Sequence, residues 1–197
     1  MKMKSYLEPC ILKETSEGIA RYTLTDALFQ KREIMIIGEI TAELVNSVIM
    51  QIRYLQNEDP EKEITLFINS LGGEVASGLA LYDVIQSVKC PIRTICVGTA
   101  YSMGALLFIS GKKREILPHA RVMIHDPLIV DGVGGSALKI ENISKNLLKS
   151  RTITAEIIAK HSGRTLEEVL EKTSVDTYFD ANEAIEFGLA DEIIYEI

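Results

Sequence analysis

The architecture is indicated most clearly by the stretch ITLFINSLGG at residues 64–73, where an apolar run ends in polar residues and two glycines. A helical pattern follows directly, with Val75, Leu79, Tyr82 and Ile85 at spacings of three and four, and Pro91 lies just beyond its end. A short apolar run favours a buried strand, and the wider spacing favours an amphipathic helix. The stretch therefore predicts one strand, loop and helix unit.

The same unit precedes and follows this stretch. Residues 34–38 form an apolar run that ends at Gly38, and Thr41 is expected to cap a helix. Residues 92–98 form another apolar run, which leads into a helix from about Ser102 to Ile109. Successive units of this kind predict an α/β fold with parallel strands, whose loops at the strand carboxyl ends carry function. Two short strands are expected next, at residues 114–117 and 121–125.

Length, charge and cysteine content limit the possible functions. The chain has 197 residues, 47% of them hydrophobic, and a formal charge of −7. It is long enough for one domain, and its charge disfavours both nucleic acid and membrane partners. Met1–Cys10 lacks an apolar signal segment and no uncharged run could span a bilayer, so a cytoplasmic location is expected. The three cysteines are interpreted as reduced thiols.

One long helix is predicted from Ser136 to about His161, with Gly163 as its stop. At 1.5 Å per residue it spans roughly 39 Å, about the width of a domain of this size. We interpret it as overhanging its own core and serving oligomerisation, with a helix lying across its own domain as the alternative. Short helices at residues 165–172 and 181–187 and an apolar segment at 190–194 complete the chain.

Ser102 lies where an apolar strand passes into a helix, which is a suitable place for a nucleophile. Amides at a helix amino terminus are unpaired and the helix dipole is positive there, so negative charge on an attacked carbonyl oxygen is stabilised. The Gly72 and Met103 amides, from adjacent loops, can form such an oxyanion hole. The simpler interpretations are a helix-capping serine and a tight turn at Gly72-Gly73.

His125 ends another predicted strand and can act as a general base if a carboxylate holds its second ring nitrogen. Asp126 and Asp176 are both candidates for that carboxylate. Asp126 is adjacent to His125, so its side chain should point to the other side of an extended backbone. Spacing alone leaves this choice open. His161 is interpreted as a helix carboxyl-terminal residue, where a cation is favoured.

Four spaced motifs carry a family resemblance. They are FINSLGG at residues 67–73, GTAYSMGA at 98–105, RVMIHDP at 121–127 and AIEFGLAD at 184–191. Together they resemble ClpP, the proteolytic subunit family of Clp proteases, from about residue 14 to 194. The resemblance implies an α/β fold of ClpP/crotonase-like repeated ββα units with a protruding handle helix. It implies one domain over residues 1–197, with a head at about 1–127 and 163–197 and a handle at about 128–162.

The resemblance also implies the site and the partners. Its catalytic residues fall on Ser102, His125 and Asp176, its oxyanion donors on Gly72 and Met103, and its substrate groove beside Gly132, Val133, Gly134 and Gly135. The implied protein is an ATP-dependent serine endopeptidase that needs no metal and no cofactor. It self-associates into stacked heptameric rings, a tetradecamer. An AAA+ ATPase of the ClpX, ClpA or ClpC type feeds unfolded protein substrates into the enclosed chamber.

The sequence departs from the family pattern at four positions. Leu71 replaces the usual proline, Val175 an arginine, Thr65 a tyrosine of the ATPase docking pocket, and Asp126 an amide residue. The changes at Leu71 and Val175 permit an alternative, a weakly active or regulatory ring subunit of a mixed Clp complex, against which the intact triad argues. A third hypothesis is an acyl-CoA hydratase or isomerase of the crotonase type, which would need a carboxylate beside the paired amides and no Ser102.

Overall fold

The computed structural model describes residues 9–16, 18–130 and 132–197. Residues 1–8, where no signal segment is predicted, lie outside the described residues. The strands are β1 (Cys10–Thr15), β2 (Gly18–Thr23), β3 (Glu33–Ile40), β4 (Ile64–Gly73), β5 (Ile92–Tyr101), β6 (Lys113–Ile116), β7 (Arg121–Ile124), β8 (Thr177–Phe179) and β9 (Glu192–Ile193). The helices are α1 (Leu24–Gln30), α2 (Ala42–Glu58), α3 (Val75–Ser87), α4 (Met103–Ile109), α5 (Ala137–Ser162), α6 (Leu166–Thr173) and α7 (Ala181–Phe187).

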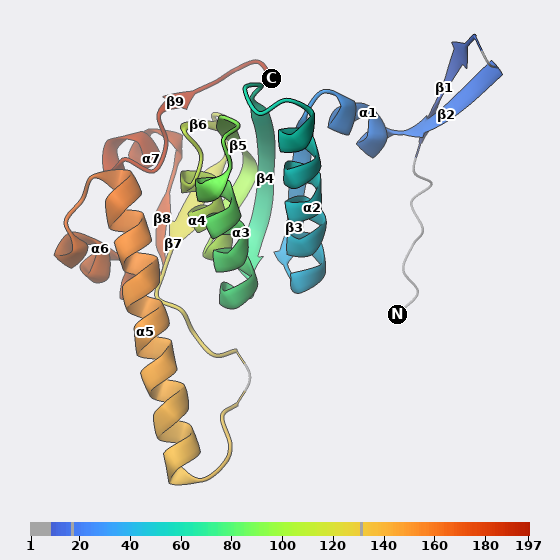
Figure 1. Cartoon of the computed structure of the whole chain (residues 1–197). Helices are drawn as coiled ribbons and strands as arrows, with labels where there is room; N and C mark the ends of the chain where they lie inside the picture. The colour runs from blue at the N-terminus through green and yellow to red at the C-terminus, as the bar shows by residue number, and fades with distance from the viewer. Residues whose placement is uncertain (1–8, 17, 131) are drawn as a thin grey trace.

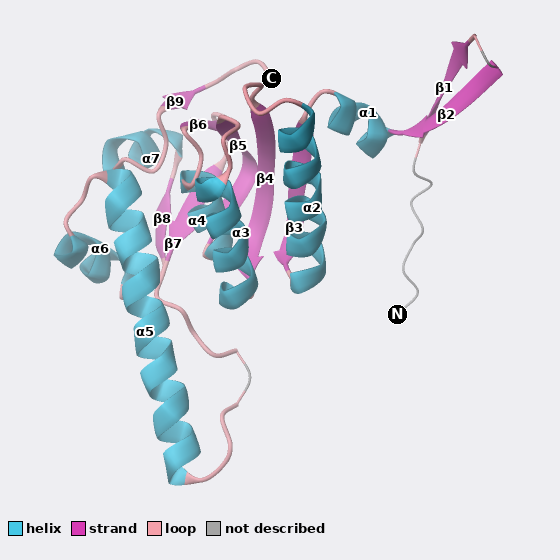
Figure 2. Cartoon of the chain, viewed as in Figure 1, coloured by secondary structure: helices cyan, strands magenta, loops and turns pink. Residues whose placement is uncertain are grey.

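The α/β fold predicted from the repeated units is confirmed. One seven-stranded sheet runs in the order β3-β4-β5-β6-β9, with β7 beside β5 and β8 beside β7. Every pairing in it is parallel except that of β7 with β8. Helices α2 and α3 lie across one face of the sheet (Figures 1 and 2). The antiparallel β1–β2 hairpin stands apart from this body at the end of α1 (Figure 1).

Strand β5 organises the sheet because two strands share its far edge. Its first part, Arg93–Cys96, pairs with β6, and its last residues, Thr99–Tyr101, pair with β7. In that register Tyr101 lies opposite Met123. The residues that follow the two strands, Ser102 and His125, therefore emerge side by side at the same edge of the sheet.

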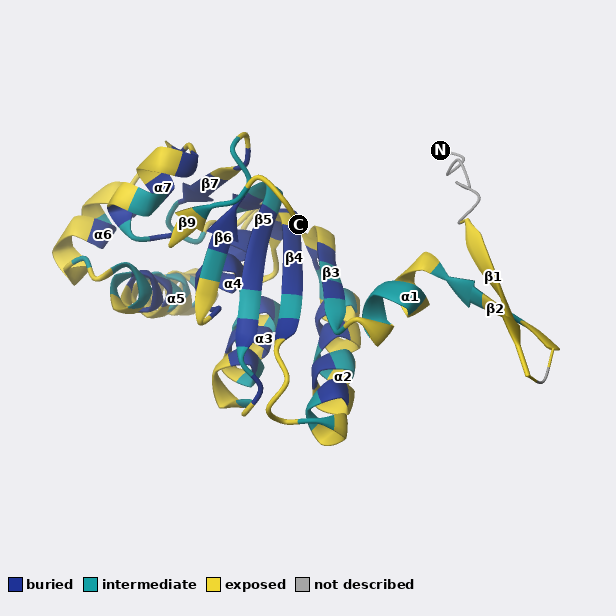
Figure 3. Ribbon diagram, turned by 90° about the horizontal axis from the view of Figure 1, so that it is seen from above, coloured by how far each residue is buried: buried dark blue, intermediate teal, exposed yellow. Residues whose placement is uncertain are grey.

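The core is centred on α4. All seven residues of this helix are buried, as expected for a helix that is apolar on every side. Strand β4 contributes Ile64, Leu66 and Ile68, each with no exposed surface, to the same core. Figure 3 shows the buried centres of β4, β5 and β6 beside the mostly exposed outer helices. Close packing around α4 gives the segment that carries Ser102 a rigid base.

Strand β4 is longer than its sequence indicates. Residues 69–73, predicted to be a loop, continue the strand. Asn69 pairs with Ile37, and after a register shift Gly72 and Gly73 pair with Glu39 and Ile40. The reason is close packing of main chains, because a Cβ on Gly73 would lie 2.3 Å from the Ile40 carbonyl oxygen. Glycine at this position thus permits pairing instead of marking a tight turn.

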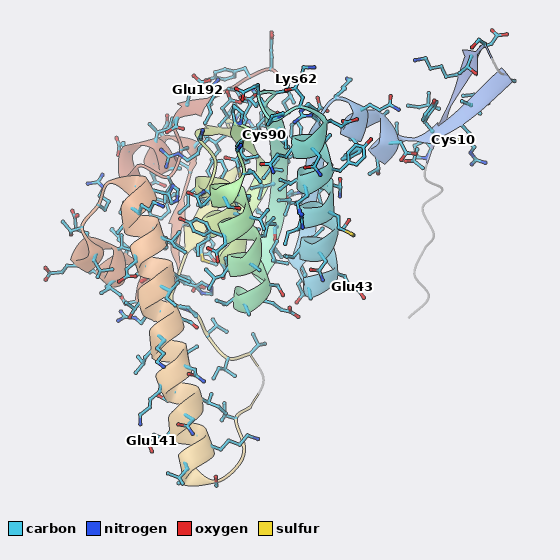
Figure 4. The ribbon with its side chains drawn as sticks, in the orientation of Figure 1. Cys10, Glu43, Lys62, Cys90, Glu141 and Glu192 are labelled. Carbon is cyan, nitrogen blue, oxygen red and sulfur yellow. The ribbon has the colours of Figure 1, made fainter. Side chains whose placement is uncertain are left out.

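The prediction of a long overhanging helix is confirmed in its bounds and its burial. Helix α5 starts after its N-cap Ser136 and ends at Gly163, which has φ 72°. Its buried residues, Thr154, Ala155, Ile157 and Ile158, belong to its last third. The remainder extends away from the body, with Glu141 near the far end (Figure 4). None of the helices in the described residues is both long and apolar enough to cross a bilayer.

The carboxyl-terminal elements are joined to the body through Arg114. Its guanidinium donates to the carbonyls of His161 and Gly188 and is paired with Asp191. His161 donates or accepts a 2.9 Å hydrogen bond at Nε2 with the Tyr82 hydroxyl. Burial, together with Lys160 and Arg114, lowers the pKa of His161 to about 4. The interpretation of His161 as a helix-stabilising cation is therefore wrong near neutral pH.

Candidate active site

Ser102 connects β5 to α4 with an unusual backbone. Its φ and ψ are 53° and −120°, a conformation that residues with a side chain rarely adopt. Such a conformation costs on the order of 1–3 kcal/mol and persists only where the surroundings enforce it. The Ser102 amide donates to the Met123 carbonyl at 2.8 Å, which fixes this turn against β7. The simple interpretation as a capping serine is wrong, because the hydroxyl is bonded to a side chain instead of to α4.

His125 follows β7 and lies between two side chains. Its Nε2 is 2.8 Å from Ser102 Oγ and its Nδ1 is 3.0 Å from Asp176 Oδ1. An ionised carboxylate can only accept, so Nδ1 carries the imidazole proton and donates it to Asp176. Nε2 is then the acceptor for the Ser102 hydroxyl. The imidazole is mostly buried, with 14% of its side chain exposed.

The structure brings Asp176, and not Asp126, to the imidazole. Asp176 lies between α6 and β8, and 56% of its side chain is exposed. Asp126 instead accepts from Arg151 Nε at 2.5 Å and from the Thr173 hydroxyl at 2.7 Å. The choice that spacing left open is therefore decided by packing of α5 and α6 against the end of β7.

Gly72 brings β4 against the turn at Ser102. It has φ 104°, and a Cβ built on it would lie 2.7 Å from Ser102 Cβ and 3.3 Å from the Met103 amide nitrogen. This approach requires glycine on both steric and conformational grounds. The pairing predicted between Gly72 and Met103, from adjacent loops, thus corresponds to adjacent positions in space.

The two amides differ in their present partners. Met103 is the first residue of α4, so its amide precedes the intrahelical hydrogen bonds. The Gly72 amide is not free, because it donates to the buried Ser70 hydroxyl at 3.1 Å. One of the two amides expected to form the oxyanion hole is therefore already engaged by a side chain.

A surface depression of about 670 Å³ lies beside Gly72. Its lining residues come from the ends of β3, β4 and β5 and include the half-exposed Ile37 and the largely exposed Leu71. The run Gly132–Gly135 is exposed in the loop before α5. Its position beside a substrate groove stays a prediction.

These groups together can support acyl transfer. A hydroxyl bonded to a neutral imidazole, whose other nitrogen is held by a carboxylate, can lose its proton as it attacks a carbonyl carbon. The thiol of Cys96, inside β5, is unsuited to nucleophilic attack, since burial raises its pKa to about 12. The arrangement also places the Ser102 hydroxyl in contact with His125, which an enzyme of the hydratase type would not require.

Comparison with protein families gives a match over almost the whole chain. The family model described as Clp protease matches residues 15–196. The chain belongs to the Clp protease family. Membership supports a peptidase function and agrees with the mostly parallel α/β fold. The matched residues include Ser102, His125 and Asp176 and the elements beside them.

Three of the four departures from the Clp protease pattern lie on the surface or at its edge. Leu71 is exposed beside the depression, and Val175 is exposed in the turn before Asp176. Thr65 pairs with Glu33 and Arg93 across the sheet. The fourth departure, Asp126, is engaged by Arg151 and Thr173 as described above.

Sequence patterns gave no signal for several residues around this candidate site. Ser70 lies within the motif at residues 67–73 and its spacing indicates no role, yet its hydroxyl accepts from the Gly72 amide. Asn69 accepts from the Thr99 amide and hydroxyl and so joins the ends of β4 and β5. Arg151 is one of several cations on a long polar helix, and nothing in its spacing distinguishes it.

Proposed function

We propose that this chain is a serine endopeptidase subunit whose nucleophile is Ser102. The observation that carries the proposal is the position of His125, within hydrogen-bonding distance of both Ser102 Oγ and Asp176 Oδ1. In this mechanism His125 Nε2 takes the hydroxyl proton while Ser102 Oγ bonds to the peptide carbonyl carbon. Asp176 holds the imidazole in the required tautomer and stabilises the imidazolium that forms.

The negative charge that develops on the carbonyl oxygen is stabilised by the Gly72 and Met103 amides. For Gly72 this means that the substrate oxygen replaces Ser70 Oγ as the acceptor. When the carbon–nitrogen bond breaks, the leaving amine takes the proton from His125. Water then attacks the acyl-enzyme with His125 as the base, which restores the serine hydroxyl.

The finer features of the proposal concern assembly and substrate. The overhanging part of α5 exposes Leu138, Ile140 and Leu148, an apolar surface suited to a second copy in stacked heptameric rings. An enclosed chamber would admit unfolded chains and peptides, delivered in the cytoplasm by an AAA+ ATPase. The run Gly132–Gly135, in the loop that leads into the projecting end of that helix, would border the bound substrate.

Peptide hydrolysis by the purified chain tests the proposal. A fluorogenic short peptide is expected to be cleaved, and a serine-directed fluorophosphonate is expected to label Ser102. Ser102→Ala is expected to lower the turnover number by ~10⁴-fold or more, as loss of a serine nucleophile does elsewhere. If the folded chain neither cleaves nor is labelled, alone or mixed with a related subunit, the active assignment is wrong.

One observation favours the alternative of a weakly active or regulatory ring subunit. The Gly72 amide is occupied by Ser70, so one oxyanion donor is engaged before substrate arrives. A regulatory subunit would change the turnover of a related active subunit when the two are mixed, and Ser102→Ala would leave that change intact. Loss of the effect with Ser102→Ala would instead support hydrolysis by this chain.

A further inference from the structure

Asp126 is held by three elements at once, although the proposed reaction makes no use of it. Its carboxylate accepts from Arg151 on α5 and from Thr173 at the end of α6, with one oxygen for each donor. Its amide donates to the Thr173 carbonyl at 2.7 Å. A second guanidinium nitrogen of Arg151 donates to the Leu170 carbonyl at 3.3 Å. The end of β7, the middle of α5 and the end of α6 therefore meet at this carboxylate.

Arg151 occupies a distinctive place on α5. The buried residues of this helix begin at Thr154, three residues later, whereas the preceding turns extend away from the body (Figure 1). Arg151 thus lies where the projecting part of the helix joins the packed part. If the projecting part moved relative to the sheet, the hydrogen bond between Arg151 and Asp126 would be the first contact to be strained.

Asp176 depends on the same junction for its position. It lies three residues beyond Thr173, and its own side chain and that of Val175 are mostly exposed. The turn that carries Asp176 is bonded to the end of α6, because the Thr177 hydroxyl donates to the Lys172 carbonyl at 2.6 Å. Core packing therefore contributes little at Asp176 itself. Its distance from His125 depends on two anchors, the end of α6 before it and the pairing of β8 with β7 after it, where Thr177 lies opposite Ile124.

We propose that Asp126 and Arg151 form a positioning pair, which holds Asp176 against His125 by anchoring the end of α6 to β7 and α5. Asp126 follows His125 directly in the chain. Its carboxylate therefore links the end of β7, which carries His125, to the end of α6, which leads to Asp176. Through Arg151 the pair also couples the triad to the orientation of the projecting helix. The inference rests on the peptidase proposal for its activity readouts, but the geometry it predicts can be measured without turnover.

The test compares Asp126→Ala, Arg151→Ala and the double variant with the unchanged chain. The fraction of competent sites is measured by fluorophosphonate labelling, and the turnover number is then expressed per labelled site. Each single variant is expected to lower this turnover ~10- to 100-fold, the range for displacement of a reacting group by up to about 1 Å. The peptide KM is expected to stay within about twofold of the unchanged value, because the pair does not line the depression beside Gly72.

Three comparisons separate positioning from general stability. The double variant is expected to resemble the worse single variant, since residues acting as one unit are not additive. Asp126→Asn retains an acceptor oxygen and is expected to recover most of the turnover lost in Asp126→Ala. Lys62→Ala removes a cation from another aspartate pair, with Asp59 at 3.2 Å, and is expected to leave turnover unchanged. Lys62 and the far end of α5 lie at opposite ends of the molecule (Figure 4).

A crystal structure of Asp126→Ala completes the test. The separation of His125 Nδ1 and Asp176 Oδ1 is expected to rise from 3.0 Å to beyond hydrogen-bonding distance, about 3.5 Å. Loss of this contact in a chain that is inactive from the outset would uphold the pair and reject the peptidase proposal. An unchanged separation, or a loss of labelled sites with normal turnover at those that remain, would overturn the pair as a positioning device.

Discussion

Replacement of Gly72 by alanine is the most direct test of the proposed oxyanion hole. The added Cβ would lie 2.7 Å from Ser102 Cβ and 3.0 Å from the Tyr101 carbonyl oxygen. Favourable carbon–carbon contact begins at about 3.5 Å, so the two segments must separate by roughly 0.8 Å. Both neighbours belong to the turn that sets the Ser102 hydroxyl and the Met103 amide.

The expected loss follows from this displacement. A misplacement of about 1 Å lowers the rate by ~10²-fold, and loss of one oxyanion donor lowers it by ~10²–10³-fold. We expect Gly72→Ala to reduce the peptide turnover number within that range. The positive φ of 104° adds backbone strain of roughly 1–3 kcal/mol to the folded state.

Gly163→Ala is the matched control for this strain. Gly163 also has a positive φ, 72°, but a Cβ there meets open space at the end of α5. It is expected to lose stability and keep its turnover per labelled site. Hydrolysis of a fluorogenic peptide, with sites counted by fluorophosphonate labelling and folding checked by circular dichroism, measures both. Turnover of folded Gly72→Ala within about threefold of the unchanged chain would refute the assignment of Gly72.

Three further predictions concern stability. Ser102→Gly is expected to abolish hydrolysis. Its free energy of unfolding in urea is expected to exceed that of Ser102→Ala by ~1 kcal/mol, because glycine relieves the strain of the positive φ. If Ser102→Ala is the more stable of the two, the turn is unstrained. The pKa of His161 is about 4 in the folded chain and 6.5 in the unfolded chain. Between these pH values only the unfolded chain binds a proton at His161. The free energy of unfolding therefore falls by up to about 3 kcal/mol as the pH drops from 6.5 to 4. His161→Gln, which can keep a bond to Tyr82, is expected to flatten this part of the curve of unfolding free energy against pH, and an unaltered slope would assign it to other groups. Arg114→Ala is expected to cost about 2–4 kcal/mol in urea unfolding, because two helix-terminal carbonyls lose their partner and Asp191 loses the guanidinium while keeping the amide of residue 114. A cost below about 0.5 kcal/mol would mean that water replaces the guanidinium.

Local patterns predicted most of the secondary structure because each rests on neighbouring residues. Asp180 and Thr165 cap their helices as capping boxes, and α7 has the bounds that its spacing indicates. The extension of β4 through Gly73 could not be predicted in this way. It depends on contact with Ile40, which is distant in sequence, and a pair of glycines is equally typical of a turn.

The candidate site divides along the same line. Ser102 and His125 were indicated from their places at strand ends, because parallel strands bring such ends to one edge of a sheet. The choice between Asp126 and Asp176 was supplied by family resemblance, since residue spacing carries no information on which side chain reaches the imidazole. The engagement of the Gly72 amide by Ser70 had no sequence signal at all.

The sequence by itself determined the α/β class, the long helix and the places where a nucleophile and a base could stand, because periodicity and end signals are local properties of the chain. Only the tertiary structure decided which acid meets His125, how β4 reaches Ser102 and why Asp126 is held by Arg151. Those relations arise from packing between elements separated by dozens of residues. Their energies depend on distances of a few ångströms that a linear pattern does not encode.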